Sequence, residues 1–438
     1  MARQAIDLST LGASDKYVIF RCKSNPFPIT GVSASDLGFP PTDEKVTEEI
    51  LAFIKSTYDR KSYGGLVIVG DYGFGKTYIL RHVERQINEA LYYRGSERAC
   101  AVYIDNPEPP AIEDFITKFL DRFGMHKFLT LLWHLVSQRF QEGLIKEGPG
   151  FLNRFFKSPS QLELFGKKSV NAADAEAVFG NPFKFIDWLY ESSADLGEVG
   201  RFAQKEVFES IFNHPEITER LSSLDNYSEG ESYRRWMEIL NYKTIRRTLR
   251  KELDPSVFFR SILTVFRQNG FRHVYLLVDE FEDVYSRTDK RGRLAYCSAL
   301  RGMIEYNMEY FSLILAVKLD AWDKITAEMA AFAERFARKV ELLGLTKQQL
   351  ERLIVDYLSR VRDEDSGDKD SVYPFDADAV DEILHVAHAN HRVALEICYV
   401  LFEYAADQGL TTISAALVRD LPKIRESLVK ARAGRIEL

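Results

Sequence analysis

The sequence predicts an α/β protein with a five-stranded parallel sheet, a large helical insertion and a C-terminal helical domain. Two observations support this fold. Short apolar runs rich in β-branched residues alternate with helical patterns, as in parallel sheets whose faces are covered by helices. A long middle stretch and the end of the chain show helical patterns only. The expected strands lie at 66–69, 101–104, 274–278, 313–317 and 340–343.

The same patterns divide the chain into regions. Residues 1–42 contain many prolines and glycines, which indicates an extended segment. An α/β domain comprises 43–123 and 256–345, and the helical insertion at 124–255 separates its two parts. Residues 346–438 form a helical domain that ends in a basic tail.

The composition is that of a globular protein, with 46% hydrophobic residues and a net charge of −7. Such a chain has no overall attraction to phosphate polymers, although local basic faces remain open. The four cysteines are far apart and form no C-x-x-C pair, so we expect no structural zinc site. The N-terminus lacks the apolar core of a signal peptide, and no apolar stretch reaches the roughly 20 residues of a membrane span. We therefore expect a cytoplasmic protein with no membrane partner.

A glycine-rich octet follows the first expected strand and precedes a helical pattern. The motif G-x-x-x-x-G-K-[ST] is matched in full by Gly70, Asp71, Tyr72, Gly73, Phe74, Gly75, Lys76 and Thr77, and Tyr78 follows it. Glycines let backbone N–H groups wrap phosphates, and the following helix adds its positive N-terminal end. Lys76 would reach the β- and γ-phosphates, and the Thr77 hydroxyl would ligate Mg²⁺. The octet predicts a P-loop for ATP and Mg²⁺; the alternative is a glycine turn without a ligand.

Two carboxylates end the third expected strand. Val278 closes an apolar run, and Asp279 and Glu280 follow it, which is the Walker B arrangement. Asp279 would hold Mg²⁺ directly or through water, and Glu280 would orient and activate the attacking water. The alternative is a solvated strand end. Together with the octet, the pair predicts a P-loop NTPase that hydrolyses ATP.

The octet GDYGFGKT, the segment LLVDE and the all-helical end of the chain resemble the AAA+ ATPases. The similarity is greatest to the origin-recognition initiator and STAND-like branch, because Asn390–Leu395 resembles its G-N-P-R-x-A-L motif. By this resemblance the C-terminal helices form a lid, and Arg392 is the sensor 2 arginine that reaches the terminal phosphates. Arg335 and Arg338 stand where such proteins place an arginine finger. The alternative for each of these arginines is an ordinary solvated charge.

Departures from the AAA+ pattern limit what the resemblance implies. The sensor 1 position, normally polar, reads Val317-Lys318-Leu319-Asp320, so Lys318 or Asp320 would have to take that role. Too few residues follow the lid for the family's DNA-binding winged helix, so DNA binding is not inherited. Asn25-Pro26-Phe27 lies either against the adenine or in a packed loop. A looser likeness connects the chain to ATP-binding proteins of BREX-type phage-defence loci.

Basic residues cluster in the insertion and in the tail. Each cluster has two possible interpretations, a face that binds nucleic acid or a solvated amphipathic helix. In the insertion, Trp236 and Tyr242 are interleaved with Arg234, Arg235, Lys243, Arg246, Arg247, Arg250 and Lys251. The tail carries Lys423, Arg425, Lys430, Arg432 and Arg435.

The expected function is that of an AAA+ type ATPase that couples its nucleotide state to a conformational change. The process is DNA-associated, such as phage defence, replication or transposition, and the partners are ATP and a second copy of the chain or another protein. The alternative is a STAND-like signalling switch or scaffold with slow hydrolysis.

Overall fold

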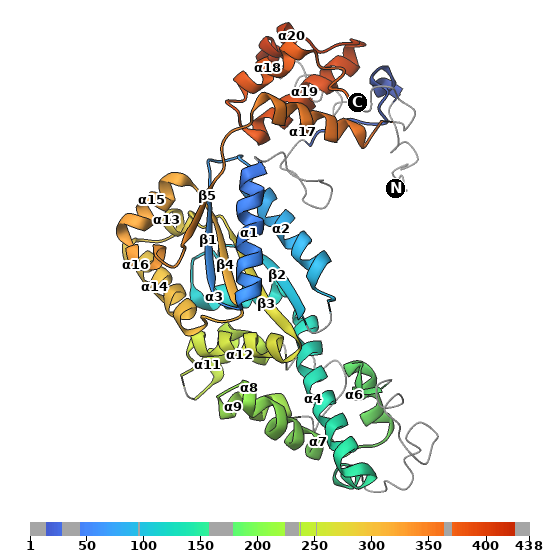
Figure 1. Cartoon of the computed structure of the whole chain (residues 1–438), viewed down its shortest axis with the longest axis vertical. Coiled ribbons are helices and arrows are strands. Elements are labelled where there is room, and N and C mark those ends of the chain that lie inside the picture. The colour runs from blue at the N-terminus through green and yellow to red at the C-terminus, as the bar shows by residue number, and fades with distance from the viewer. Residues whose placement is uncertain are drawn as a thin grey trace, which may run out of the picture. The chain divides into compact units, whose positions relative to one another are not determined.

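In a computed structural model of the chain, a five-stranded parallel sheet is built with the strand order β2-β3-β4-β1-β5 (Figure 1). The predicted α/β fold is confirmed. The strands are β1 (Gly64–Val69), β2 (Arg98–Asp105), β3 (Phe271–Asp279), β4 (Phe311–Val317) and β5 (Arg338–Glu341). The structure describes residues 15–28, 44–94, 97–156, 178–223, 236, 238–250, 252–362 and 370–424.

The register of the central strands brings their carboxyl ends to one edge of the sheet. β2 and β3 pair in parallel with Asp105 opposite Asp279, and β3 and β4 pair in parallel with Val278 opposite Leu315. Every residue of β4 and all but one of β3 are buried. This explains why these strands read as continuous apolar runs rather than as alternating patterns.

The fifth strand differs from the sequence prediction by two residues. β5 begins at Arg338 and ends at Glu341, because Leu343 is 69% exposed and Val340 is the buried residue of the strand. The Leu342 N–H still donates to the Val69 carbonyl at 2.8 Å, just beyond the strand end. Arg338 therefore lies in the strand and not before it.

The chain divides into two compact units. The first, here called the sheet unit, consists of the described residues of 51–67 and 83–339. The second, the lid unit, consists of the described residues of 1–50, 68–82 and 340–438. The octet and Arg392 belong to the lid unit, whereas Asp279 and Glu280 belong to the sheet unit.

The α/β part carries helices between its strands. Aromatic contacts hold α3 and α12 to each other and to β3, with Phe119 5.7 Å from Phe259 and Phe266 5.2 Å from Phe271 between ring centroids. The helices are α1 (Glu44–Arg60), α2 (Lys76–Leu91), α3 (Ile112–Phe123), α12 (Pro255–Gln268), α13 (Asp283–Arg287), α14 (Lys290–Tyr306), α15 (Leu319–Glu328) and α16 (Ala330–Ala333).

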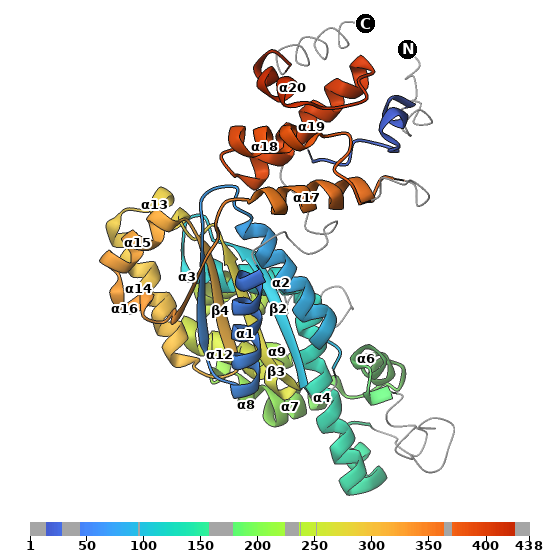
Figure 2. The same ribbon diagram turned by 45° about the horizontal axis from the view of Figure 1, so that its top comes forward.

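The described part of 124–255 contains helices and no strand. Figures 1 and 2 show its helices extending from one end of the sheet. Phe140 is fully buried there and contacts Phe151, Phe155 and Phe185, so the insertion has an aromatic core of its own. The elements are α4 (Met125–Glu147), η5 (Gly148–Arg154), α6 (Pro182–Glu191), α7 (Leu196–Ala203), the π-helical η8 (Gln204–Phe208), α8 (Glu209–Ile211), α9 (Pro215–Ser222) and α11 (Tyr242–Thr248).

The lid helices form the core of the lid unit. A capping box between Thr346 and Gln349 starts the first of them, and Gly409 in a left-handed conformation ends the third. No helix in the described ranges is long and apolar enough to cross a membrane. The lid helices are α17 (Lys347–Ser359), α18 (Ala377–Val386), α19 (His391–Gln408) and α20 (Ala415–Arg419).

Residues 15–28 are part of the lid core. The short helix η2 (Asp15–Phe20) lies beside α19, and Phe27 is buried against Phe375 and Phe402 (Figures 1 and 2). The Asn25-Pro26-Phe27 segment is thus a packed loop whose phenylalanine is buried in the lid core.

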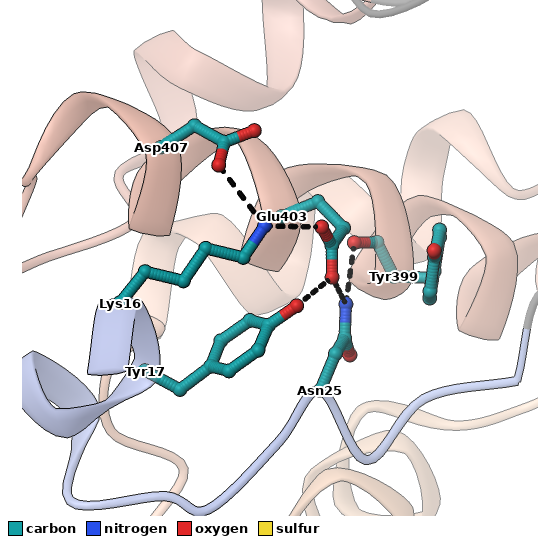
Figure 3. Close-up of polar contacts among 6 residues, drawn as sticks. All are labelled: Lys16, Tyr17, Asn25, Tyr399, Glu403 and Asp407. Atoms are coloured by element: carbon teal, nitrogen blue, oxygen red, sulfur yellow. Dashed lines mark hydrogen bonds and ion pairs between the residues drawn. The ribbon is translucent and has the colours of Figure 1, made fainter. Parts of the chain in front are cut away.

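Polar contacts fasten this segment to α19 (Figure 3). The Glu403 carboxylate accepts hydrogen bonds from Lys16 at 2.8 Å, from the Tyr17 hydroxyl and from Asn25 at 3.0 Å. Lys16 also pairs with Asp407 at 3.0 Å. We call these five residues the Glu403 cluster.

Candidate functional site

The octet forms a loop between the end of β1 and the start of α2. Gly73 and Gly75 have φ angles of +81° and +87°, a region that residues with a Cβ rarely adopt. At Gly75, no heavy atom of the described residues lies within 4 Å of the position where a Cβ would stand. Open backbone of this kind, leading into a helix N-terminus, is suited to bind phosphate groups.

The side chains of the loop take different positions. Lys76 is only 8% exposed, and its ammonium group donates to the carbonyls of Gly70 at 2.8 Å and Asp71 at 3.1 Å. Thr77 is exposed in the first turn of α2. Tyr78 is half-buried and packs against the lid core. Lys76 is thus held against the backbone of the loop and Thr77 is accessible, whereas Tyr78 contributes to packing.

The corner between α18 and α19 meets this loop. His388 and Ala389 both have positive φ angles, +48° and +57°, which are uncommon for residues with side chains. Leu345 fixes the corner because its N–H donates to the Ala389 carbonyl at 2.7 Å. Asn390 follows and caps α19 by accepting from the backbone N–H groups of Arg392 and Val393. The strained corner sets the position at which α19 begins.

Asn390 and Arg392 contact the P-loop directly. The side-chain amide of Asn390 donates to the backbone carbonyl of Tyr72 at 2.5 Å. A Cβ added to Gly73 would lie 2.3 Å from the side-chain oxygen Oδ1 of Asn390. The Arg392 guanidinium bonds the Tyr72 hydroxyl and stacks over its ring, 5.3 Å from the centroid. The sequence motif around Arg392 is therefore placed on the glycine-rich loop, although Asn390 had no predicted role of its own.

Asp279 is a buried carboxylate at the end of β3, only 2% exposed. One of its oxygens accepts from the Tyr103 hydroxyl at 2.9 Å, and the other accepts from the Glu280 N–H at 2.9 Å. Asp105, its partner across the sheet, forms an ion pair with Arg122 at 3.1 Å. These bonds fix the orientation of the Asp279 carboxylate.

Glu280 is exposed and has a φ angle of +52°, which stores strain at this position. Although part of the residue is exposed, its carboxyl group loses some solvation to the surrounding residues, and this, together with the nearby carboxylates of Asp279, Asp283 and Asp105, raises the pKa of Glu280 above its usual value. A raised carboxylate pKa favours accepting a proton, as a general base requires.

Asn106 is a residue near Asp279 that the sequence reasoning missed. Its N–H donates to the Asp279 carbonyl at 3.0 Å, and its side-chain oxygen accepts from the Tyr296 hydroxyl at 2.9 Å. The side-chain nitrogen is buried and has no hydrogen-bond partner in the described structure. The polar sequence Asp105-Asn106 at the end of β2 was the available signal, because parallel strands end at one edge.

The sensor 1 candidates are placed beyond β4. The Lys318 N–H donates to the Glu282 carboxylate at 3.3 Å, which links the end of β4 to the segment after β3. Asp320 instead forms an exposed ion pair with Lys324 at 3.6 Å. The structure thus connects Lys318, and not Asp320, to the residues that follow Asp279.

The two arginine-finger candidates have partners in the sheet unit. Arg335 donates to Glu305 at 2.6 Å, and its carbonyl stands against Gly65, near the start of β1. Arg338 stacks over the Phe53 ring, 5.9 Å from its centroid. A finger role for either residue stays a prediction.

The basic stretch of the insertion is partly neutralised. Lys243 pairs with Asp114 at 2.9 Å, and Arg246 pairs with Glu113. Both interleaved aromatic residues, Trp236 and Tyr242, are buried and cannot stack on nucleotide bases. Of the predicted basic residues, Arg234, Arg235, Lys251 and the tail from Arg425 onward lie outside the described residues.

No family model matches the chain, and neither does any curated protein compared with it. Among solved structures, it is similar to Drosophila ORC bound to DNA, with a TM-score of 0.41, 12% identity, and coverage of 96% of this chain and 68% of that one. It is also similar to the Aeropyrum pernix ORC2 protein in its ADPNP–ADP complexes, with a TM-score of 0.43, 11% identity, and coverage of 88% and 70%.

The Thermotoga maritima RuvB Holliday junction branch migration motor is similar as well, with a TM-score of 0.36, 10% identity, and coverage of 92% and 74%. The ORC proteins belong to the branch that the sequence resembles.

Proposed function

We propose that this protein is an AAA+ type ATPase that binds ATP with Mg²⁺ and hydrolyses it to ADP and phosphate. The observation that carries the proposal is the contact of the lid with the phosphate-binding loop. Arg392, a cation at the start of α19, is stacked on Tyr72 within the loop that carries Lys76. A buried lysine in a glycine-rich loop and an exposed arginine that contacts the same loop are suited to a highly anionic ligand.

Each proposed role follows from the chemistry of the side chain. Lys76 would neutralise charge on the β- and γ-phosphates, and Arg392 would stabilise the terminal phosphate. Glu280 would take a proton from the attacking water, for which its raised pKa is suited. His391 is no second cation here, because burial lowers its pKa to about 4.

The donor set also fits a divalent cation. Carboxylate and hydroxyl oxygens are preferred ligands of Mg²⁺, and Asp279 and Thr77 are the groups that would hold it. Mg²⁺, when bound, neutralises charge on the phosphate oxygens. Tyr103 keeps the Asp279 carboxylate oriented for this role.

The output would be a change in the lid, since α19 carries the arginine that contacts the terminal phosphate. We propose that this output serves a DNA-associated process such as phage defence, replication or transposition, in an assembly with further copies or another protein. Arg335 or Arg338 would then act on the nucleotide of a neighbouring copy. The alternative is a STAND-like switch, which hydrolyses slowly and recruits partners.

Titration with ATP and Mg²⁺ tests the proposal. Wild-type protein should bind ATP, and Lys76→Ala should weaken binding by about 100-fold, because a buried charge partner is lost. Equal affinities would refute the phosphate site. The ATPase rate with and without DNA, together with the mass of the assembly in each nucleotide state, distinguishes the DNA-associated process from the STAND-like switch. Stimulation by DNA favours the first, and slow turnover with ATP-dependent assembly favours the switch.

A further inference from the structure

We propose that Tyr72 is a positioning residue, which holds the Arg392 guanidinium over the P-loop so that it contacts the terminal phosphate of ATP. This inference rests on the proposed function, because it assigns a role to one side chain of the same site. It goes beyond the P-loop motif, in which the position of Tyr72 accepts any residue.

The exposure of Tyr72 is the first observation. Its side chain is 61% exposed, although a tyrosine at the edge of a packed unit normally buries its ring. One face of the ring is covered by Arg392 at 5.3 Å, and the hydroxyl bonds the same guanidinium. Both the ring and the hydroxyl of Tyr72 thus contact Arg392.

The geometry leaves Arg392 able to bind an anion. A guanidinium has five N–H donors in a planar fork, and stacking uses its face while the tyrosine hydroxyl engages one nitrogen. Among the described residues, no carboxylate forms an ion pair with Arg392. The remaining donors can therefore bind a phosphate while Tyr72 keeps the side chain in place. Holding a long side chain in advance lowers the entropy lost when the ligand binds.

The backbone of Tyr72 has a separate attachment. Its carbonyl accepts from Asn390 at 2.5 Å, and this bond does not depend on the tyrosine side chain. Substitution of Tyr72 therefore removes the contact with Arg392 and leaves the junction of loop and lid in place. This separation makes a mutational test specific.

The test is a double-mutant cycle on the full-length protein, read as dissociation constants for a non-hydrolysable ATP analogue and for ADP, both with Mg²⁺. Tyr72→Ala should weaken the ATP analogue about fivefold and ADP less than about twofold, because only ATP has the γ-phosphate. Tyr72→Phe, which retains the ring, should weaken the analogue about twofold. In an Arg392→Ala background, Tyr72→Ala should add no further loss.

Tyr93→Ala is the matched control, because Tyr93 is an 87% exposed tyrosine outside the site. It should change neither affinity. If Tyr72→Ala weakens both nucleotides equally, or if its effect persists without Arg392, then Tyr72 only shapes the loop and the inference is wrong. If the wild-type protein binds neither nucleotide, the proposed function itself fails, which is a different result.

Discussion

Two glutamates in this protein have opposite surroundings. Glu403, on α19, is paired with a lysine and accepts bonds from a tyrosine and an asparagine. Burial raises its pKa, but these donors outweigh burial, so the pKa is below its usual value. Glu280, after β3, stands among other carboxylates on a strained backbone, and its pKa is raised.

The difference separates structural from chemical use of one residue type. Glu403 has its oxygens satisfied by three side chains, so its charge contributes to folding. The negative charge of Glu280 is repelled by the neighbouring carboxylates, which lowers the stability of the fold. Such a destabilising arrangement is typical of residues that act on a ligand or in a reaction. A carboxylate with satisfied partners, like Glu403, is expected to stabilise the fold. A carboxylate among like charges, like Glu280, is a candidate for catalysis.

The largest expected effect comes from Glu280→Gln. Without a proton acceptor, turnover of ATP should fall by about 100-fold or more, while ATP affinity stays within about twofold. Steady-state rates and equilibrium titration measure the two quantities. The control is Asp283→Asn, which removes a neighbouring carboxylate that only adds to the raised pKa of Glu280 and should keep most of the activity. A Glu280→Gln protein that hydrolyses ATP at the wild-type rate would place the general base elsewhere.

The second effect concerns Glu403→Ala. This change leaves the buried Tyr17 hydroxyl without its acceptor and removes one bond each from Lys16 and Asn25, so the free energy of unfolding should fall by about 2–3 kcal/mol. Urea denaturation measures it. Asp407→Asn is the control, since that residue makes one partly exposed ion pair with Lys16, worth less than about 1 kcal/mol. Equal losses from the two changes would contradict the view that Glu403 is the centre of its cluster.

The smallest effect is a difference in pH dependence. Because the pKa of Glu403 is lowered in the folded protein, its ionised form stabilises the fold at pH values above 4.5, the usual pKa of a glutamate. This stabilisation is lost as the pH falls through the lowered pKa. The raised pKa of Glu280 has the opposite sign, so its stabilising protonated form is lost as pH rises from 4.5 through the raised value. At pH 7, Glu403→Gln should melt below wild type and Glu280→Gln about 1–2 °C above it.

The Glu280→Gln difference should shrink as the pH falls toward 4.5, because the raised pKa lets this carboxyl group take up its proton above that pH. The Glu403→Gln difference should shrink only below 4.5, as the pH passes the lowered pKa of Glu403. Thermal melts of the two variants and wild type between acid and neutral pH measure this. Shifts of the same sign at pH 7 would show that the two environments do not differ as described.

Local sequence patterns were enough to predict much of the fold. Buried parallel strands are short apolar runs, and each of the five expected runs became a strand of the sheet. The helix after the P-loop begins at Lys76, as predicted, because the octet leaves the strand and enters the helix within a few residues. The contact of Arg392 with the loop was accessible only through a family motif, since more than 300 residues separate the two.

Features that depend on tertiary packing escaped the sequence reasoning. The polar residues at the end of β2 were a local signal for Asn106, but its pairing with Asp279 was not, because the two strands pair across more than 170 residues. The sequence of the basic stretch does not show that its two aromatic residues are buried in the structure. For Phe27 the sequence left an adenine contact and a packed loop open, because the lid helices that enclose it are distant in the chain.

The lid contains residues from both ends of the described chain, and this sets the order in which it can be completed during synthesis. Tyr17 and Glu403 are 386 positions apart. At about 5–20 residues per second, a ribosome needs about 20–80 s to make the second after the first. During that interval the start of the chain has no partner helix, whereas the P-loop and the sheet strands are already emerging. The contact between Tyr17 and Glu403 can therefore form only after the P-loop and the sheet strands have been made.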